Sequence, residues 1–108
     1  LGADRVEGVQ LGGGEVLPAG MVVFASGIRP RVDLAKESDV PVNAGILVND
    51  RLEARLEGVY AVGECAEHDG TVYGTVQPIY EQCTVLADVL TGADPHAAYR
   101  GSKVYTKL

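Results

Sequence analysis

The apolar residues of this chain occur in short runs separated by glycine-rich or polar segments, a pattern typical of an α/β protein. Apolar stretches at 6–11 and 16–17 flank the glycine triplet 12–14, which predicts a tight β-hairpin because glycine readily adopts the positive φ angles of a reversal. The continuous run 21–25 predicts a strand covered on both faces. Two further runs predict short buried strands, at 46–48 and 59–62.

Two helices of different length are expected. A short one spans about 32–37, with Asp33 near its start, where a carboxylate interacts favourably with the helix dipole. A longer one spans about 77–90, with Pro78 suited to its first position and Gly92 to its end. Its apolar residues form one stripe for packing on a sheet, made of Ile79, Cys83, Leu86 and Leu90.

The glycine triplet could instead bind a phosphate group. A P-loop requires Gly-Lys followed by Ser or Thr, and a dinucleotide fingerprint requires Gly-x-Gly-x-x-Gly between a strand and a helix. Here Leu17 stands where the third glycine is needed, and Pro18 opposes a helix. We therefore interpret the triplet as a turn.

Composition and charge limit the classes of function. The 108 residues suit one domain of ordinary size, and the net charge of −6 argues against binding to nucleic acid or anionic membranes. No apolar stretch approaches the roughly 20 residues of a membrane-spanning helix, and no leader directs export. The two cysteines form no Cys-x-x-Cys pair, so we expect packing roles for Cys65 and for a buried Cys83, in a reducing, cytoplasmic setting.

The strongest candidate for chemistry follows the run 59–62. Gly63 permits a tight turn or the close approach of a ligand, and Glu64 then stands at the carboxyl end of the predicted strand, where open α/β sheets bind ligands. Its carboxylate can accept hydrogen bonds from the hydroxyls of a sugar or ribityl chain; the alternative is a solvated loop acid. A zinc site at Cys65 and His68 is disfavoured because no second pair of ligands follows at suitable spacing.

Three segments resemble motifs of the FAD-dependent pyridine nucleotide–disulfide oxidoreductases. Residues 60–64 (Tyr-Ala-Val-Gly-Glu) are similar to the family's second flavin-binding motif, with glutamate in place of the commoner aspartate. Residues 21–30 resemble the strand and turn that close the NAD(P)-binding domain, and 73–82 resemble the loop and helix that pass near the flavin ring. The patterns at 63–68 and 99–102 are most similar to the branch of the large subunit of NAD(P)H-dependent nitrite reductase.

The resemblance implies an α/β chain with a partial FAD/NAD(P)-binding fold of the three-layer ββα type, formed by a hairpin, further strands and one long C-terminal helix. Residues 1–30 would close an NAD(P)-binding domain, 31–98 would form the C-terminal part of the FAD-binding domain, and 99–108 would begin a truncated further domain with a strand. No Gly-x-Gly-x-x-Gly motif occurs and the chain does not begin with Met. We therefore expect a piece of a longer polypeptide that is inert alone.

The resemblance also assigns candidate cofactor contacts. Gly63 and Glu64 would contact the ribityl chain of FAD. Backbone N–H groups at Val76 and Gln77, at the positive end of the long helix, would stabilise negative charge on the reduced flavin; the alternative is an uncommitted helix start. Gly27 would lie where the two cofactor domains meet. Arg29 would either contact a cofactor or form a salt bridge that stabilises the connection between the two domains.

The implied activity is electron transfer from NAD(P)H through FAD to a further acceptor, which is nitrite in the most similar branch. Siroheme and an iron–sulfur cluster would bind outside this segment, and no metal site is expected within it. The expected partner is the rest of the same polypeptide, and exposed sheet edges would favour self-association of the piece alone. Two alternatives stay open: a non-catalytic interaction module on the same scaffold, and part of a rubredoxin or ferredoxin reductase or of an NADH oxidase.

Overall fold

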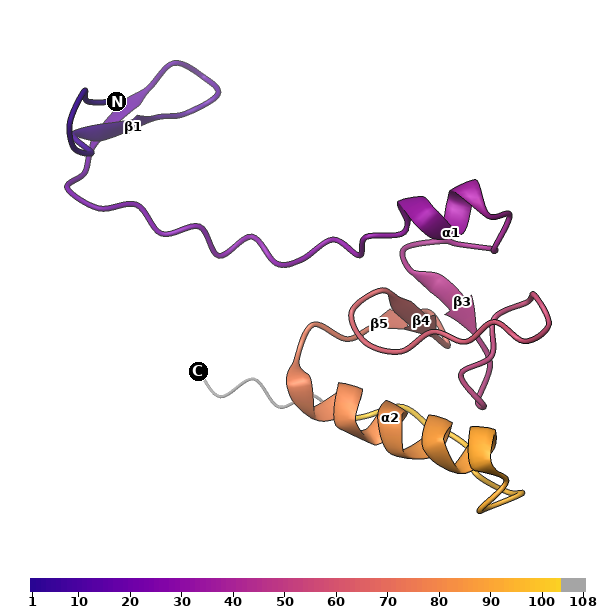
Figure 1. Ribbon diagram of the computed structural model, residues 1–108. Coiled ribbons are helices and arrows are strands. Elements are labelled where there is room, and N and C mark those ends of the chain that lie inside the picture. The colour runs from indigo at the N-terminus through magenta and orange to yellow at the C-terminus, as the bar shows by residue number, and fades with distance from the viewer. Residues whose placement is uncertain (104–108) are drawn as a thin grey trace.

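The computed structural model describes residues 1–103, which form two regions that differ in packing. Residues 1–31, here called the arm, comprise a hairpin and an extended segment, and residues 32–103, called the body, contain two helices and a three-stranded sheet (Figure 1). The Cα radius of gyration is 19.4 Å, whereas a compact domain of this size has a value of about 13 Å. The arm therefore makes the molecule elongated.

The arm begins with the predicted hairpin. Strand β1 (Gly8–Gln10) pairs antiparallel with strand β2 (Val16–Pro18). Gly14 has a φ of +87°, and its N–H donates to the carbonyl of Leu11 at 2.9 Å, which closes the turn. The hairpin prediction is confirmed, and the left-handed φ explains why a glycine stands at the end of the triplet.

The strand predicted at 21–25 is wrong for this chain. The segment is extended but belongs to no sheet among the described residues. A strand requires a neighbour that pairs with its N–H and C=O groups, and residues 1–103 supply none here. Three of its side chains are at least 78% exposed, namely Met21, Val23 and Phe24. The run is thus an exposed apolar surface.

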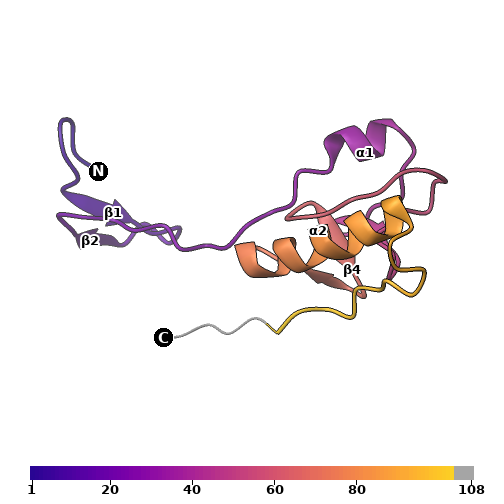
Figure 2. The ribbon, with the colours of Figure 1, turned by 60° about the horizontal axis from the view of Figure 1, so that its bottom comes forward.

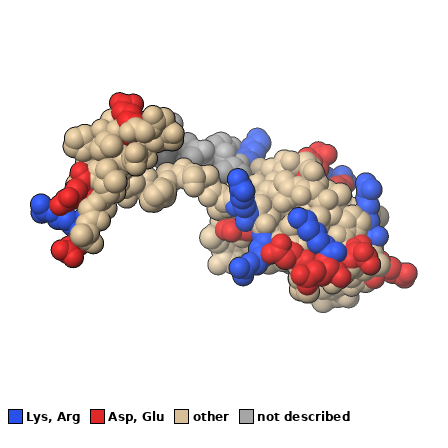
Figure 3. Space-filling view, turned by 90° about the horizontal axis from the view of Figure 1, so that it is seen from above, with Lys and Arg blue, Asp and Glu red and all other residues tan. Residues whose placement is uncertain are grey.

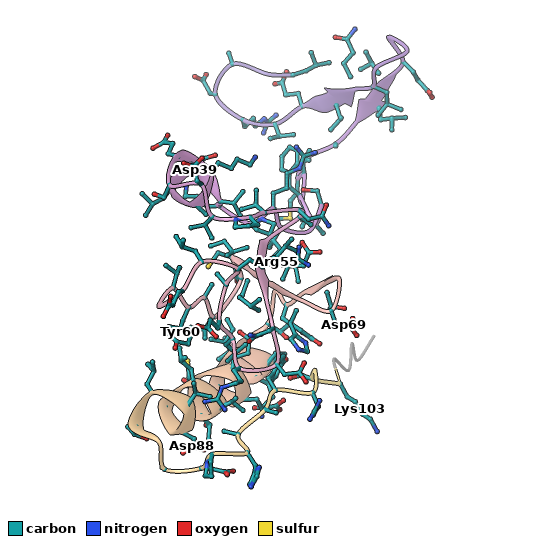
Figure 4. All side chains as sticks on the ribbon, turned by 90° about the vertical axis from the view of Figure 1, so that its right-hand side faces the viewer. Asp39, Arg55, Tyr60, Asp69, Asp88 and Lys103 are labelled. Atoms are coloured by element: carbon teal, nitrogen blue, oxygen red, sulfur yellow. The ribbon has the colours of Figure 1, made fainter. Side chains whose placement is uncertain are left out.

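The body has three layers. Its sheet has the order β3-β4-β5, in which β3 (Ile46–Val48) runs parallel to β4 (Ala66–His68), and β4 pairs antiparallel with β5 (Thr71–Val72). Helix α1 (Asp33–Glu37) lies on one side of this sheet and helix α2 (Val76–Thr91) on the other (Figures 1 and 4). The short helix and strand β3 agree with their predictions.

Each side of the sheet has its own small core. The side of α1 buries Ala35, Val40 and Ala54. The side of α2 buries Leu52, Tyr73 and Tyr99, against which Val85 and Leu86 of the helix pack. Leu52 is completely inaccessible to solvent, so the second core holds the most enclosed apolar side chain of the described chain.

The strand predicted at 59–62 is also wrong. Within this run only Tyr60, which lies between the levels of α1 and α2 in Figure 4, forms a bridge, an isolated one with Glu53. The N–H of Ala61 donates to the carbonyl of Leu52 at 3.1 Å. Leu52 has a φ of +61°, a left-handed conformation that interrupts regular pairing. The regular strand of this region is β4, which begins only after the Gly63 turn.

Helix α2 confirms the predicted long helix. It begins at Val76, so Pro78 is its third residue and not its first. It ends at Thr91, where Gly92 adopts the left-handed conformation with a φ of +70° and donates its N–H to the carbonyl of Asp88. This is the C-terminal glycine cap that the sequence predicted.

The buried face of α2 differs from the predicted stripe. The face turned to the body carries Pro78, Gln82, Val85 and Leu86. Cys83 is exposed and Leu90 is 60% exposed, so the buried thiol predicted at Cys83 is wrong. Leu86 belongs to both sets and Ile79 is half-buried, so these two residues of the predicted stripe face the body as expected. Gln82, and not the neighbouring Cys83, turns inward to a buried hydrogen bond with Gly63.

The surface and the chain end add three observations. No helix within residues 1–103 is long and apolar enough to cross a membrane. Over the same residues, no group of three or more His, Cys, Asp or Glu side chains could hold a metal ion. Acidic and basic side chains intermingle on the face of the body seen in Figure 3.

The strand predicted at 99–108 does not form at 99–103, and its remaining residues lie outside the described part.

Candidate functional site

Gly63 forms the centre of the candidate site, in the turn before β4. It is buried, with a φ of +88°. Its N–H donates to Oε1 of Gln82 at 2.8 Å, and its carbonyl accepts the N–H of Ala66 at 3.1 Å. A Cβ at this position would approach Ile79 only to 4.0 Å. Glycine is therefore required here by the backbone conformation and not by a lack of space.

Glu64 follows this turn and is exposed. Because the predicted strand at 59–62 does not form, the carboxylate stands just before β4 instead of at the end of a strand. The neighbouring Cys65 lines a largely apolar cavity of about 420 Å³ that also borders Leu34 of α1 and Tyr60. Glu64 itself does not line this cavity, but its exposed carboxylate can accept hydrogen bonds from hydroxyl groups of a ligand.

The start of α2 is the second part of the site. Thr75, the residue before the helix, is extended and caps no N–H group with its side chain, and no acidic residue lies in the first turn. The N–H groups of Val76 and Gln77 thus have no helical acceptor, and both residues are exposed. Together with the helix dipole they favour a negative group nearby.

Gly27, the third predicted contact, lies in the arm. Its φ is +79°, and no atom comes within 4 Å of where its Cβ would be. The next residue, Ile28, packs on Gly74: a Cβ on that glycine would lie 2.9 Å from Cδ1 of Ile28. Arg29 is exposed and makes no ion pair within residues 1–103.

Two positions relate the predicted segments to the start of α2. A Cβ built on Gly63 would lie 4.0 Å from Ile79 of α2, and Ile28 meets Gly74 just before that helix. Neither relation involves Glu64, Val76 or Gln77 themselves. In Figure 2 the extended segment of the arm projects onto this end of α2, whereas Figure 1 shows the two apart. The approach of Ile28 to Gly74 thus brings the arm to the loop before the helix.

Gln82 is the site residue that the sequence analysis missed. It is 0% exposed and lies four residues after the buried Pro78 on the same helix face. Three residues further on, Val85 packs in the core. A glutamine at spacings of four and three from buried residues would have indicated an inward-facing amide.

A second polar cluster fixes the end of the described chain to the sheet. Nε2 of His68 contacts Oδ1 of Asp50 at 3.0 Å, and Arg100 pairs with the other carboxylate oxygen. The hydrogen bond to His68 lowers the pKa of Asp50, burial opposes this as the next largest influence, and the positive charge of Arg100 adds a smaller lowering. The ring of His68 packs edge-on against Tyr99, with centroids 5.0 Å apart. This cluster joins chain segments and borders a cavity of about 390 Å³ that Val48 and Asp69 also line.

Comparison with known proteins gives consistent results. The sequence profile of a family described as pyridine nucleotide-disulphide oxidoreductase matches residues 2–86. The chain is 48% identical over its whole length to a nitrite reductase [NAD(P)H] from Bacillus subtilis (strain 168), of which it covers 13%. It is 42% identical, over 92% of its length, to a rubredoxin-NAD(+) reductase from Acinetobacter baylyi, of which it covers 25%.

A solved structure is similar as well. The ferredoxin reductase for the CYP199A2 system from Rhodopseudomonas palustris matches 85% of this chain with a TM-score of 0.74 and 34% identity, and 24% of that protein is covered. This likeness confirms the predicted partial FAD/NAD(P)-binding fold. The chain spans only 13% to 25% of the length of these relatives.

Proposed function

Because the chain belongs to the pyridine nucleotide-disulphide oxidoreductase family, we propose that it is a segment of an enzyme that passes electrons from NAD(P)H through FAD to nitrite. The observation that carries this proposal is the identity of 48% to a nitrite reductase over the full chain. Siroheme and an iron–sulfur cluster would be bound by other parts of the same polypeptide, in a cytoplasmic enzyme.

The residues present fit the flavin that the family uses. The ribityl hydroxyls of FAD can donate hydrogen bonds to the exposed carboxylate of Glu64. The flavin ring has an edge that becomes negative on reduction. The free N–H groups at Val76 and Gln77 suit that negative edge. When bound, FAD supplies hydride acceptance and onward electron transfer. The chain's own groups orient it and stabilise its charge.

A second candidate is supported by specific similarities. The matches to a rubredoxin-NAD(+) reductase and to a ferredoxin reductase favour a small electron-carrier protein as the acceptor. The chain itself would have the same role in both enzymes. A non-catalytic interaction module is disfavoured because the turn at Gly63 and the uncapped start of α2 are both present.

The test uses the full polypeptide that contains this chain. We expect it to bind FAD, seen by flavin absorbance, and to oxidise NAD(P)H with nitrite as acceptor, whereas the 108 residues alone show no turnover. Glu64→Ala should weaken FAD binding about tenfold through loss of charge-assisted hydrogen bonds. Glu57→Ala, an exposed glutamate in a loop, is the matched control. Reduction of rubredoxin or ferredoxin but not of nitrite would replace the first proposal by the second.

A further inference from the structure

Gln82 stands out as a polar side chain that is completely buried in the middle of α2. Its Oε1 accepts the N–H of Gly63 at 2.8 Å. Its Nε2 is buried and has no hydrogen-bond partner within the described chain. Burial of an amide costs free energy unless its groups are paired, so an apolar residue would pack here more favourably. The position therefore requires the amide for something other than packing.

The bond to Gly63 indicates what the amide does. Gly63 is buried and left-handed, so its N–H points into the body and cannot reach water. Gly63 belongs to no strand, so no neighbouring strand of the described chain accepts its N–H, and the side chain of Gln82 accepts it instead. Loss of this acceptor would leave a buried donor unpaired, and the turn would relax to another conformation. The direction in which Glu64 presents its carboxylate depends on that turn.

The same part of α2 also holds the segment after the helix. Glu81, next to Gln82, accepts a hydrogen bond from Oγ of Ser102. That oxygen lies 2.6 Å from the hydroxyl of Tyr99, and the N–H of Ser102 donates to the hydroxyl of Tyr73 at 3.1 Å. Burial raises the pKa of Tyr99, the hydrogen bond with Ser102 lowers it, and the hydrogen bond with Tyr73 raises it. The residue next to Gln82 thus holds the end of the described chain.

We propose that Gln82 is a positioning residue for the flavin site: through the N–H of Gly63 it fixes the turn that presents Glu64 to the ribityl hydroxyls. This inference rests on the proposed function, since it assumes that the turn binds FAD. It adds a residue that touches no cofactor and acts through the backbone of another. A merely structural role would stabilise the fold without affecting cofactor affinity.

The experiment compares three variants of the full polypeptide. Gln82→Met keeps the size of the side chain and removes the acceptor, and Gln82→Glu keeps an oxygen that can accept. Gln10→Met makes the same chemical change at an exposed position of the hairpin. The measurements are the dissociation constant of FAD, by titration of the flavin-free protein, and hydrogen exchange at the Gly63 amide.

We expect Gln82→Met to weaken FAD binding about tenfold and to speed exchange at Gly63 by at least a similar factor. Gln82→Glu should stay within about threefold of the parent, and Gln10→Met should equal it. Unchanged FAD affinity in a folded Gln82→Met protein overturns the proposal. Equal weakening of FAD binding by Gln82→Met and Gln82→Glu also overturns it. So does fast hydrogen exchange at the Gly63 amide in the unaltered protein, and this last measurement can be made even if Gln82→Met fails to fold.

Failure of the proposed function has a different signature. If the unaltered polypeptide binds no FAD, the flavin assignment is wrong, whatever the variants do. If it binds FAD and the Gln82 variants bind FAD equally tightly, the flavin assignment stands and the positioning role is wrong.

Discussion

The arm and the body both contain large apolar side chains, but the arm exposes most of them to solvent and the body buries several. Phe24 of the arm is 90% exposed, whereas Leu52 of the body is fully buried. The body brings its own neighbours: sheet, helix and the segment ending at Ser102 all pack around Leu52. The arm has a hairpin and an extended run that pairs with no strand of the described chain. Burial is therefore decided by the partners that a segment finds, and apolar character alone does not provide them.

The largest difference should appear when each region loses an apolar side chain. Leu52→Ala removes a side chain packed between Tyr73 and Tyr99 and should cost about 3 kcal/mol of the free energy of unfolding. Phe24→Ala should cost less than about 0.5 kcal/mol in this chain. Urea unfolding followed by circular dichroism measures both. Similar losses at the two positions would abolish the division into arm and body.

A buried carboxylate gives the stability of the body a dependence on pH. Glu67 accepts hydrogen bonds from Nδ2 of Asn43 at 2.9 Å and from the N–H of Gly45 at 2.8 Å. These bonds lower its pKa below the usual 4.5. The stabilisation is therefore complete above that unfolded value and is lost as the pH falls through the lower folded value.

Glu67→Gln should destabilise the body by about 1 kcal/mol at pH 7, and the difference from the parent should shrink below pH 4.5. Glu57→Gln, at an exposed loop position, serves as control and should have no such dependence. Urea unfolding at several pH values provides the measurement. A difference that grows toward low pH would show that the carboxylate is not stabilised by these bonds.

Glycine substitutions should separate the regions by a smaller margin. Gly63→Ala forces a Cβ into a left-handed conformation and should cost about 1 kcal/mol. Gly12→Ala, in the hairpin turn, meets no atom within 4 Å and has no positive φ, so it should change stability by less than about 0.5 kcal/mol. Thermal unfolding of both variants tests this. If Gly63→Ala leaves the stability unchanged, the turn does not have the left-handed conformation described here.

The smallest change in stability belongs to the arm, together with a change in association. We expect the isolated chain to self-associate through the exposed run 21–25, and Met21→Ser with Phe24→Ser should make it monomeric while altering the free energy of unfolding by less than about 0.5 kcal/mol. Leu34→Ser, at a comparably exposed position of the body, should leave the association intact. Sedimentation equilibrium distinguishes these outcomes, and an equal effect of Leu34→Ser would locate the contact elsewhere.

Local signals allowed the hairpin and the limits of α2 to be predicted. The glycine triplet 12–14 and Gly92 act within a few residues, through their own backbone conformations, and such signals are visible in sequence. The run 21–25 failed because its pairing depends on a neighbour that the described chain does not contain. The run 59–62 failed because Leu52, on the neighbouring segment, adopts a left-handed φ that interrupts regular pairing, and no local signal in the run reports this.

The candidate site was predicted in its parts but not in its assembly. Motif similarity indicated Gly63 and Glu64, and helix polarity indicated Val76. The face of α2 was misplaced because an apolar stripe was assumed, while a buried hydrogen bond to the backbone turns Gln82 inward. A side chain that pairs with a backbone group leaves little trace in hydrophobic periodicity.

The contact between Ile28 and Gly74 has a consequence for biosynthesis. The arm meets the body at a residue that the ribosome adds about 45 positions later. At 5–20 residues per second, Ile28 must wait roughly 2 to 9 s before Gly74 exists. During that interval Ile28 has no docking place, so we expect the arm of the nascent chain to be most prone to capture by chaperones at this stage of its synthesis.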